Sequence, residues 1–159
     1  MAISRRRVAT VVQDVESTAG DPAGRAYGTL LGLAPAAVPN LVDAVRKGLS
    51  YRTFERFVEN TSLSATAAAT LVNISVRTLS RRKREGRLQP DESDRLLRAS
   101  RVVGRAIELF EGDRAEAKQW LARPQRALRG AMPFDLASTE VGALAVERLI
   151  DQLEQGIFV

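Results

Sequence analysis

The 159-residue sequence contains no cysteine and no histidine. Their absence excludes disulfide bonds, thiol chemistry, histidine general bases, Ser-His-Asp triads and the usual zinc sites. A Gly-rich phosphate loop is missing as well. Hydrolysis by paired carboxylates and metal binding by carboxylates alone remain open, but we expect a protein without catalysis of its own, without a metal and without a cofactor.

Long apolar runs are also missing. The Ala/Ser/Thr-rich stretch Thr61–Val76 is too short and too polar to cross a bilayer, so we expect no transmembrane helix. Residues 4–8 (Ser-Arg-Arg-Arg-Val) are faintly similar to a twin-arginine export signal, but Asp14 and Glu16 interrupt the apolar run that such a signal needs. A cytoplasmic location is therefore favoured.

Charge is distributed unevenly along the chain. Apolar residues make up 45% and charged residues 27%, which is ordinary for a globular protein, and the net charge is +5. Residues 1–87 carry 14 Lys/Arg against 7 Asp/Glu, whereas residues 106–159 carry 6 against 9. A basic front half and an acidic back half suggest two functions, with the front half near a polyanion.

The apolar periodicity predicts an all-α fold after a weakly specified amino-terminal segment. Residues 1–36 contain a Ser/Gly/Pro-rich linker and are expected to be a flexible or weakly helical arm. Helices are then expected over Asn40–Lys47, from Tyr51 after a Ser50 cap, and over Ser64–Val72, Val76–Glu85, Pro90 to about Phe110, Arg114–Ala122, Pro124–Gly130 and Glu140–Gln155. On the last helix the predicted core stripe is Val141, Leu144, Ala145, Leu149 and Leu153.

The segment Ala65–Gly86 has the pattern of a helix-turn-helix. Ala69 supplies the small residue where two helices nearly touch, and Asn73 tolerates the left-handed backbone of the turn. The residues expected to be buried around the turn are Val72, Ile74 and Leu79.

The second helix of this unit is strongly basic. Ser75 is expected to cap it and to offer its hydroxyl and amide to a phosphate, while Arg77 and Arg81 share one side with Arg84. The expected DNA contacts are Ser75, Arg77, Thr78, Ser80, Arg81, Arg82, Lys83, Arg84 and Arg87. The alternative is a solvated charged face. Arg82 stands where many such repressors carry an apolar residue, so we expect this helix to be less firmly seated than usual.

The acidic back half carries less information by itself. We expect Asp135, Glu140, Glu147, Asp151 and Glu154 to lie on solvated helix faces rather than in a metal or catalytic cluster. The chain finishes with Ile157, Phe158 and Val159 after a helix-stopping Gly156. Such an apolar end either packs on its own core or enters the pocket of another protein.

A string of ordered motifs over about residues 63–157 resembles the Xre/MbcA/ParS-like antitoxins, the partners of RES-domain toxins. The matching motifs are Leu79-Ser-Arg-Arg, Gly86-Arg-Leu, Glu92-Ser-Asp-Arg-Leu, Ala106-Ile-Glu-Leu-Phe, Gly112-Asp113, Ala117-Lys-Gln-Trp-Leu121, Pro124, Ala127-Leu-Arg-Gly130, Pro133-Phe-Asp-Leu136, Thr139-Glu-Val-Gly142 and Glu154-Gln-Gly156.

This resemblance implies an antitoxin with two domains. Residues 37–105 would form a helix-turn-helix domain that dimerises and binds the operator of its own operon. Residues 106–159 would bind a toxin that degrades NAD⁺ and would cover its active-site entrance. By that analogy the toxin-binding residues are Leu153, Gly156, Ile157, Phe158 and Val159. The alternative reading is a stand-alone helix-turn-helix transcription regulator whose C-terminal domain binds a small ligand.

Overall fold

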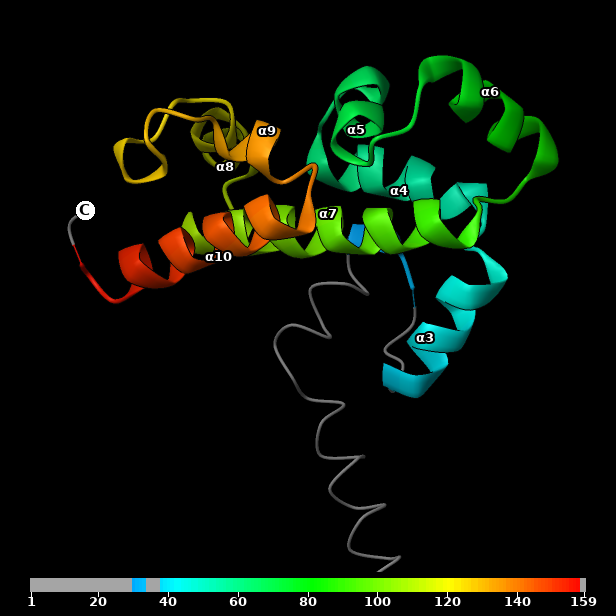
Figure 1. The fold of residues 1–159 in the computed structure, drawn as a ribbon, viewed down its shortest axis with the longest axis horizontal. Coiled ribbons are helices and arrows are strands. Elements are labelled where there is room, and N and C mark those ends of the chain that lie inside the picture. Colours follow the sequence, from blue (N-terminus) through cyan, green and yellow to red (C-terminus); the bar gives the residue numbers. More distant parts are fainter. Residues whose placement is uncertain (1–29, 34–37, 158–159) are drawn as a thin grey trace, which may run out of the picture.

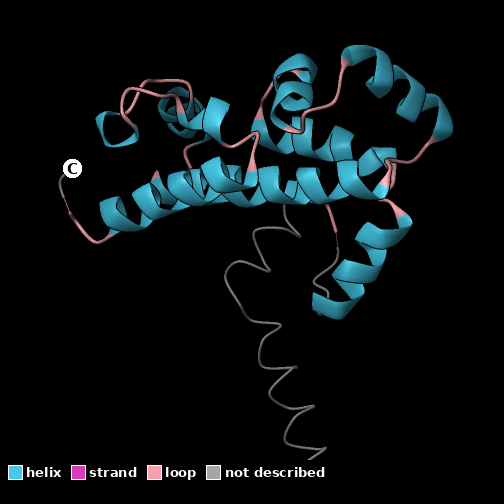
Figure 2. Cartoon of the chain, in the orientation of Figure 1, coloured by secondary structure: helices cyan, strands magenta, loops and turns pink. Residues whose placement is uncertain are grey.

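A computed structural model describes residues 30–33 and 38–157 and gives these residues an all-helical architecture (Figure 1). The elements are α3 (Val38–Lys47), α4 (Tyr51–Thr61), α5 (Ala65–Leu71), α6 (Val76–Glu85), α7 (Pro90–Leu109), α8 (Arg114–Leu121), the 3₁₀ turn η2 (Arg126–Leu128), α9 (Pro133–Leu136) and α10 (Glu140–Glu154). Over these residues the only extended pairing is an isolated bridge between Ser50 and Arg87 (Figure 2). The predicted all-α class is confirmed.

Capping side chains set most of the helix starts: Ser50 and Ser75 cap α4 and α6 as the sequence predicted, and Ser64, which the sequence counted as a helix residue, caps α5. The hydroxyl of Ser64 accepts from the Ala67 amide, and the carboxylate of Asp113 accepts from the two amides of the first turn of α8. Two elements differ from expectation. The helix predicted from Pro124 to Gly130 is only the single turn η2, and the one-turn helix α9 was not predicted, since four residues are too few to show a period.

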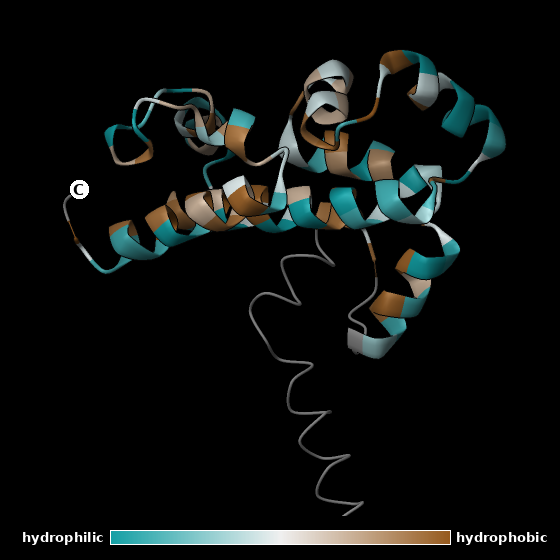
Figure 3. Ribbon diagram, in the orientation of Figure 1, coloured by the Kyte–Doolittle hydropathy of each residue, from teal (hydrophilic) through white to brown (hydrophobic). Residues whose placement is uncertain are grey.

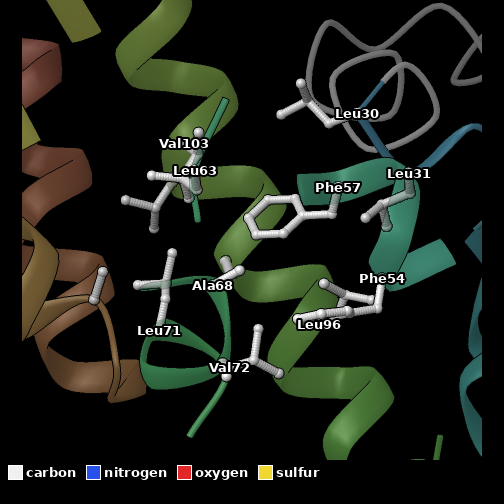
Figure 4. Packing of buried hydrophobic residues seen from close by; sticks show 14 of the residues in the cluster. Leu30, Leu31, Phe54, Phe57, Leu63, Ala68, Leu71, Val72, Leu96 and Val103 are labelled. Carbon is white, nitrogen blue, oxygen red and sulfur yellow. The ribbon is translucent and has the colours of Figure 1, made fainter. Parts of the chain in front are cut away.

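The main core lies between α4, α5 and α7. The side chains of Phe54 and Phe57 from α4, of Leu96 from α7 and of Val72 at the end of α5 are buried together there (Figure 4). Leu30 and Leu31, which belong to the predicted arm, are also buried in this core. The remaining residues of the arm lie outside the described residues, apart from Gly32 and Leu33.

The long helix α7 is the element on which both halves of the chain pack. It contacts α3 and α4 on one side of the molecule and α8 and α10 on the other. Its 20 residues span about 30 Å at 1.5 Å per residue. In Figure 1 the amino-terminal half of α7 lies under α4 and α5, and its carboxy-terminal half runs beside α10.

A buried ion pair seats α6 against the start of α7. Arg82 is 7% exposed and Glu92 is 4% exposed. The Nε and Nη2 atoms of Arg82 donate to the two carboxylate oxygens of Glu92 at 2.7 and 3.0 Å, and Nη1 donates to Glu85 at 2.8 Å. The Gln89 amide also donates to Glu92, at 2.8 Å, which ties the first turn of α7 into the same network.

Two sequence predictions about Arg82 are therefore wrong. Arg82 is not an exposed DNA contact, because its guanidinium lies inside the molecule and is bonded to two carboxylates. It also does not loosen α6, because the paired guanidinium fills the position that an apolar residue would otherwise occupy. The bond to Glu92 raises the pKa of Arg82 above its ordinary value, so the charge is permanent.

Burial alone would raise the pKa of Glu92, but the bonds from Arg82 and from the Gln89 amide outweigh it and hold that pKa below its ordinary value. Glu92 is therefore ionised in the folded protein at neutral pH. The pair is charged on both sides and fully engaged.

Arginines of α7 meet acidic side chains of α10 along the contact between these parallel helices. The arginines are Arg98, Arg101 and Arg105, and the acids are Glu140, Glu147, Asp151 and Glu154. Arg105 Nη2 lies 2.6 Å from Asp151 Oδ1, and Arg101 Nη2 lies 3.2 Å from Glu140 Oε1. The bond to Asp151 raises the pKa of Arg105. These four acids were predicted to lie on solvated faces; the structure pairs each of them with α7.

The start of α10 packs very closely on α9. A Cβ atom built at Gly142 would lie 1.9 Å from the carbonyl oxygen of Leu136. Thr139 caps this helix by accepting from the Gly142 amide at 3.1 Å. Only glycine fits at this point, and it fixes which side of α10 faces the rest of the molecule.

We predict that Gly142→Ala lowers the free energy of unfolding by about 1–3 kcal/mol, because the added methyl collides with backbone that cannot move aside easily. In a helix with free space at this position the same change would stabilise the protein by up to about 1 kcal/mol through helix propensity. A loss of stability would therefore indicate the close contact, and a gain would indicate free space. Urea denaturation followed by circular dichroism measures it. Arg148→Ala, at an exposed site of the same helix, serves as the control and should change stability by less than about 0.5 kcal/mol.

We also predict that Glu92→Gln costs about 3 kcal/mol, because it leaves a buried guanidinium with a neutral partner. Glu85→Gln should cost less than about 1 kcal/mol, since that partner is half-exposed.

The depressed pKa of Glu92 stabilises the wild-type fold above the unfolded-state pKa of about 4.5, and this stabilisation is lost as pH falls through the lower folded-state value. Denaturation measured between about pH 3 and pH 7 should therefore show a shallower acid loss of stability in Glu92→Gln than in wild type. Equal stability of the two variants, or equal acid loss in wild type and Glu92→Gln, would contradict the assignment.

Candidate functional site

The turn between α5 and α6 has the geometry that the sequence predicted. Asn73 adopts a left-handed backbone with φ of 56°, and the Ile74 amide donates to the Ala69 carbonyl at 2.8 Å. Ala69 is fully buried where the two helices approach. Arg95 of α7 donates its Nε proton to the Val72 carbonyl at 2.8 Å, so the turn is also fixed to α7.

Ser75 caps α6 as predicted. Its hydroxyl oxygen accepts from the Thr78 amide at 3.1 Å and its hydroxyl lies 2.9 Å from that of Thr78. Thr78 is half-buried and its hydroxyl is engaged in this cap, so among the predicted DNA contacts it is less available than its neighbours.

The outer side of α6 carries an exposed cationic surface. Arg77, Arg81 and Arg84 fall at i, i+4 and i+7, and each is exposed. Ser80 and Lys83 are exposed beside them. The separation of Arg81 Nε from the Glu85 carboxylate is 4.0 Å and both side chains are about half-exposed, so this contact does little to hold Arg81. We call Arg77, Ser80, Arg81, Lys83 and Arg84 the α6 basic surface.

The rotation of α6 about its axis accounts both for the burial of Arg82 and for the exposure of the α6 basic surface. Bonding to Glu92 fixes the rotation of α6 about its axis, with Leu79 and Arg82 inward. The other cations of the helix are then directed outward. A helix of about 10–12 Å diameter fits the major groove of B-DNA, which is about 12 Å wide.

Arg87 lies apart from this surface. Its Nη1 atom donates to the carbonyls of Lys47 and Gly48, at 3.1 and 2.7 Å, and so provides hydrogen-bond partners for carbonyl groups at the carboxy-terminal end of α3. The sequence grouped it with the cations of α6 because it follows them in the chain, but it comes after the stop at Gly86.

One exposed residue on α6 was missed. Val76, the first residue of the helix, is 61% exposed. The sequence offered a signal for it, because the helix-turn-helix spacing needs only Val72, Ile74 and Leu79 for the core around the turn.

The predicted apolar stripe of α10 is partly wrong. Val141 is 82% exposed and Leu144 is 42% exposed, whereas Gly142, Ala143 and Val146 are buried instead. Both sides of α10 carry apolar residues, so periodicity alone could not decide which side faces inward. The close contact at Gly142 decides it.

The predicted toxin-binding residues near the end of α10 have different environments. Leu153 is half-buried, and Gly156 is exposed with a left-handed φ of 70°. Ile157 is 47% exposed. Phe158 and Val159 lie outside the described residues. Val141 and Leu144 expose apolar side chains near the start of α10, and Ile157 exposes one just beyond its end.

Two other kinds of feature are absent from residues 30–33 and 38–157. No group of three or more His, Cys, Asp or Glu side chains among them is arranged to hold a metal ion. None of the helices that the structure describes is long and apolar enough to cross a membrane.

Two family models match adjacent parts of the chain. The Antitoxin Xre-like helix-turn-helix domain matches residues 41–101, which include α5 and α6. The Antitoxin Xre/MbcA/ParS C-terminal toxin-binding domain matches residues 105–156, which include α8, α9 and α10. The first match ends and the second begins inside α7.

Curated relatives carry matching descriptions. Antitoxin Xre of Yersinia enterocolitica (serotype O:8 / biotype 1B) is 35% identical over 135 residues, which cover 84% of this chain and 91% of the relative. Antitoxin Xre of Photorhabdus laumondii subsp. laumondii is 33% identical over 128 residues, 80% of this chain and 86% of the relative. Antitoxin Xre of Pseudomonas putida is 37% identical over 84 residues, 52% of each chain. The helix-turn-helix around α6, the separate domain that ends in α10 and these relatives lead to one conclusion: the chain belongs to the family of Xre-type antitoxins.

Proposed function

We propose that this antitoxin binds operator DNA through the α6 basic surface and represses its own operon, acting in the cytoplasm as a homodimer. The observation that carries the proposal is the division of the α6 cations into one inward, paired arginine and four outward ones. Outward arginines on a recognition helix are suited to guanine edges and phosphates. A dimer places two such helices in half-sites one helical turn apart, which compensates for the weak binding of a single short helix.

We propose further that the C-terminal domain neutralises a RES-domain toxin that degrades NAD⁺, by covering the entrance to its active site. Support comes from the exposed apolar side chains Val141, Leu144 and Ile157, which lie in or next to the part of the chain matched by the toxin-binding family model. Exposed apolar side chains of this kind, spread along one helix and just beyond its end, are typical of a protein-binding surface. The same match favours a protein partner over a small ligand, and therefore an antitoxin over a stand-alone regulator. The chain needs no catalysis of its own for this role.

The functions that we assign to the two parts of the chain follow the two family matches. We propose that residues 37–105 carry DNA binding and dimerisation and that residues 106–159 carry toxin binding. Within the second part, Leu153, Gly156 and Ile157 lead to Phe158 and Val159, and the apolar side of α10 adds Val141 and Leu144 to the surface.

The DNA-binding proposal predicts that Arg77→Ala and Arg81→Ala each cost about 1–3 kcal/mol of operator affinity. Each lost phosphate contact should also reduce the slope of log K against log salt concentration by about 0.9. Fluorescence anisotropy with operator DNA at several salt concentrations measures both quantities. The double variant Arg114→Ala/Arg126→Ala removes the same charge from exposed sites outside α6 and is the matched control. Native affinity and salt slope in the Arg77→Ala/Arg81→Ala protein would mean that another surface binds the DNA.

The toxin-binding proposal predicts that truncation after Gln155 weakens toxin binding by about ten- to a hundred-fold while the fold persists. Burial of Phe158 in a partner is worth about 1.5–3 kcal/mol, and α10 itself ends at Glu154. The readouts are the dissociation constant for the co-purified toxin, cellular NAD⁺ and the unfolding midpoint of the antitoxin. A second variant, Val141→Asp/Leu144→Asp, tests the side of α10 separately from the tail. If the truncated chain binds toxin and protects NAD⁺ as well as the full chain does, the tail is not the blocking element.

A further inference from the structure

Val76 is an exposed apolar residue in an otherwise hydrophilic part of the surface. In Figure 3 α6 begins in brown and continues largely in teal, and Val76 is 61% exposed at that beginning. Single exposed apolar residues are common and need no explanation by themselves. The position of this one, at the first residue of the recognition helix, is what gives it significance.

The first turn of a recognition helix is the part that reaches base edges in helix-turn-helix complexes. Val76 directly precedes Arg77 and lies one turn before Ser80, so it adjoins the α6 basic surface. The hydroxyls of Ser75 and Thr78 are engaged with each other and with the helix cap. The Ser80 hydroxyl donates to the Val76 carbonyl at 3.1 Å. The hydroxyls around Val76 are thus used within α6, and its methyl groups remain exposed.

The major groove offers one apolar group to such a side chain. Every other feature on the base edges there is a hydrogen-bond donor or acceptor, whereas thymine presents its C5-methyl group. Valine neither donates nor accepts a hydrogen bond. Placed against a polar base edge it would remove water from that edge without replacing its hydrogen bonds, which is unfavourable. Placed against a thymine methyl it removes apolar surface of both partners from water.

We propose that Val76 is a specificity-determining residue that contacts the methyl group of a thymine in each operator half-site, next to the base contacted by Arg77. This inference rests on the proposed function, because it requires α6 to lie in the major groove. The surrounding cations support that placement: Arg77, Arg81 and Arg84 attract the phosphates on either side of the groove, and the valine then selects among sequences that bind them equally well.

The test removes the methyl group from the DNA and from the protein separately. Each thymine of one half-site, in the promoter DNA that the protein protects in a footprint, is replaced in turn by deoxyuridine, which lacks only the C5-methyl. Binding is measured with wild type and with Val76→Ser. For one thymine we expect wild type to lose about four-fold in affinity, the value of one buried methyl group. Val76→Ser should bind the thymine and uracil duplexes almost equally.

Val76→Thr is the matched variant, because it keeps the shape and one methyl group of valine; it should retain part of the discrimination against uracil. Since residue 76 is exposed, none of these variants should shift the unfolding midpoint appreciably, and that measurement is the folding control. Equal losses on uracil substitution in wild type and Val76→Ser, at every thymine, would overturn the inference. If α6 is not the reader at all, the Arg77→Ala/Arg81→Ala protein will bind normally, so failure of the proposed function is distinguishable from failure of this contact.

Discussion

The bidentate bond between Arg82 and Glu92 is the interaction on which the geometry of the DNA-binding half depends. It joins the inner side of α6 to the first turn of α7, and the Gln89 amide completes it. A buried ion pair adds little stability compared with a well-packed apolar pair, yet loss of one partner is costly. Its effect here is therefore directional: it sets the rotation of α6 and decides which cations face solvent.

Other arginines also join one element to the next, with side chains that are less buried than that of Arg82. Arg95 holds the turn before α6, and Arg98, Arg101 and Arg105 meet the acids of α10. As a result four acidic side chains of the back half are paired with α7, although Glu140, Asp151 and Glu154 stay about half-exposed. The basic charge of α6 has no such counterpart beyond Glu85 and Glu92. The asymmetry that suggested two functions is one of charge along the sequence, and the ion pairs determine which of these charges have a close partner.

Local signals predicted most of the fold, and contacts between distant elements account for what they missed. Capping residues, the small Ala69 and the left-handed Asn73 are readable within a few positions, and the structure confirms them. The role of Arg82 was not readable, because its partner lies ten residues away in the next helix and five other basic residues surround it in the sequence. The inward side of α10 was missed for a similar reason. It depends on the approach of Leu136 to Gly142, whereas its apolar residues occupy both sides.

The continuity of α7 has a consequence for how the two binding partners are arranged. A single helix of about 30 Å passes beneath the helix-turn-helix and alongside α10, with no proline after its first position and with its one glycine, Gly104, buried. A protein bound at the α10 end of α7 is therefore held at a fixed distance and orientation from DNA bound at α6. A change of orientation at one end of α7 therefore moves the other end with it, because no proline interrupts the helix between the two surfaces.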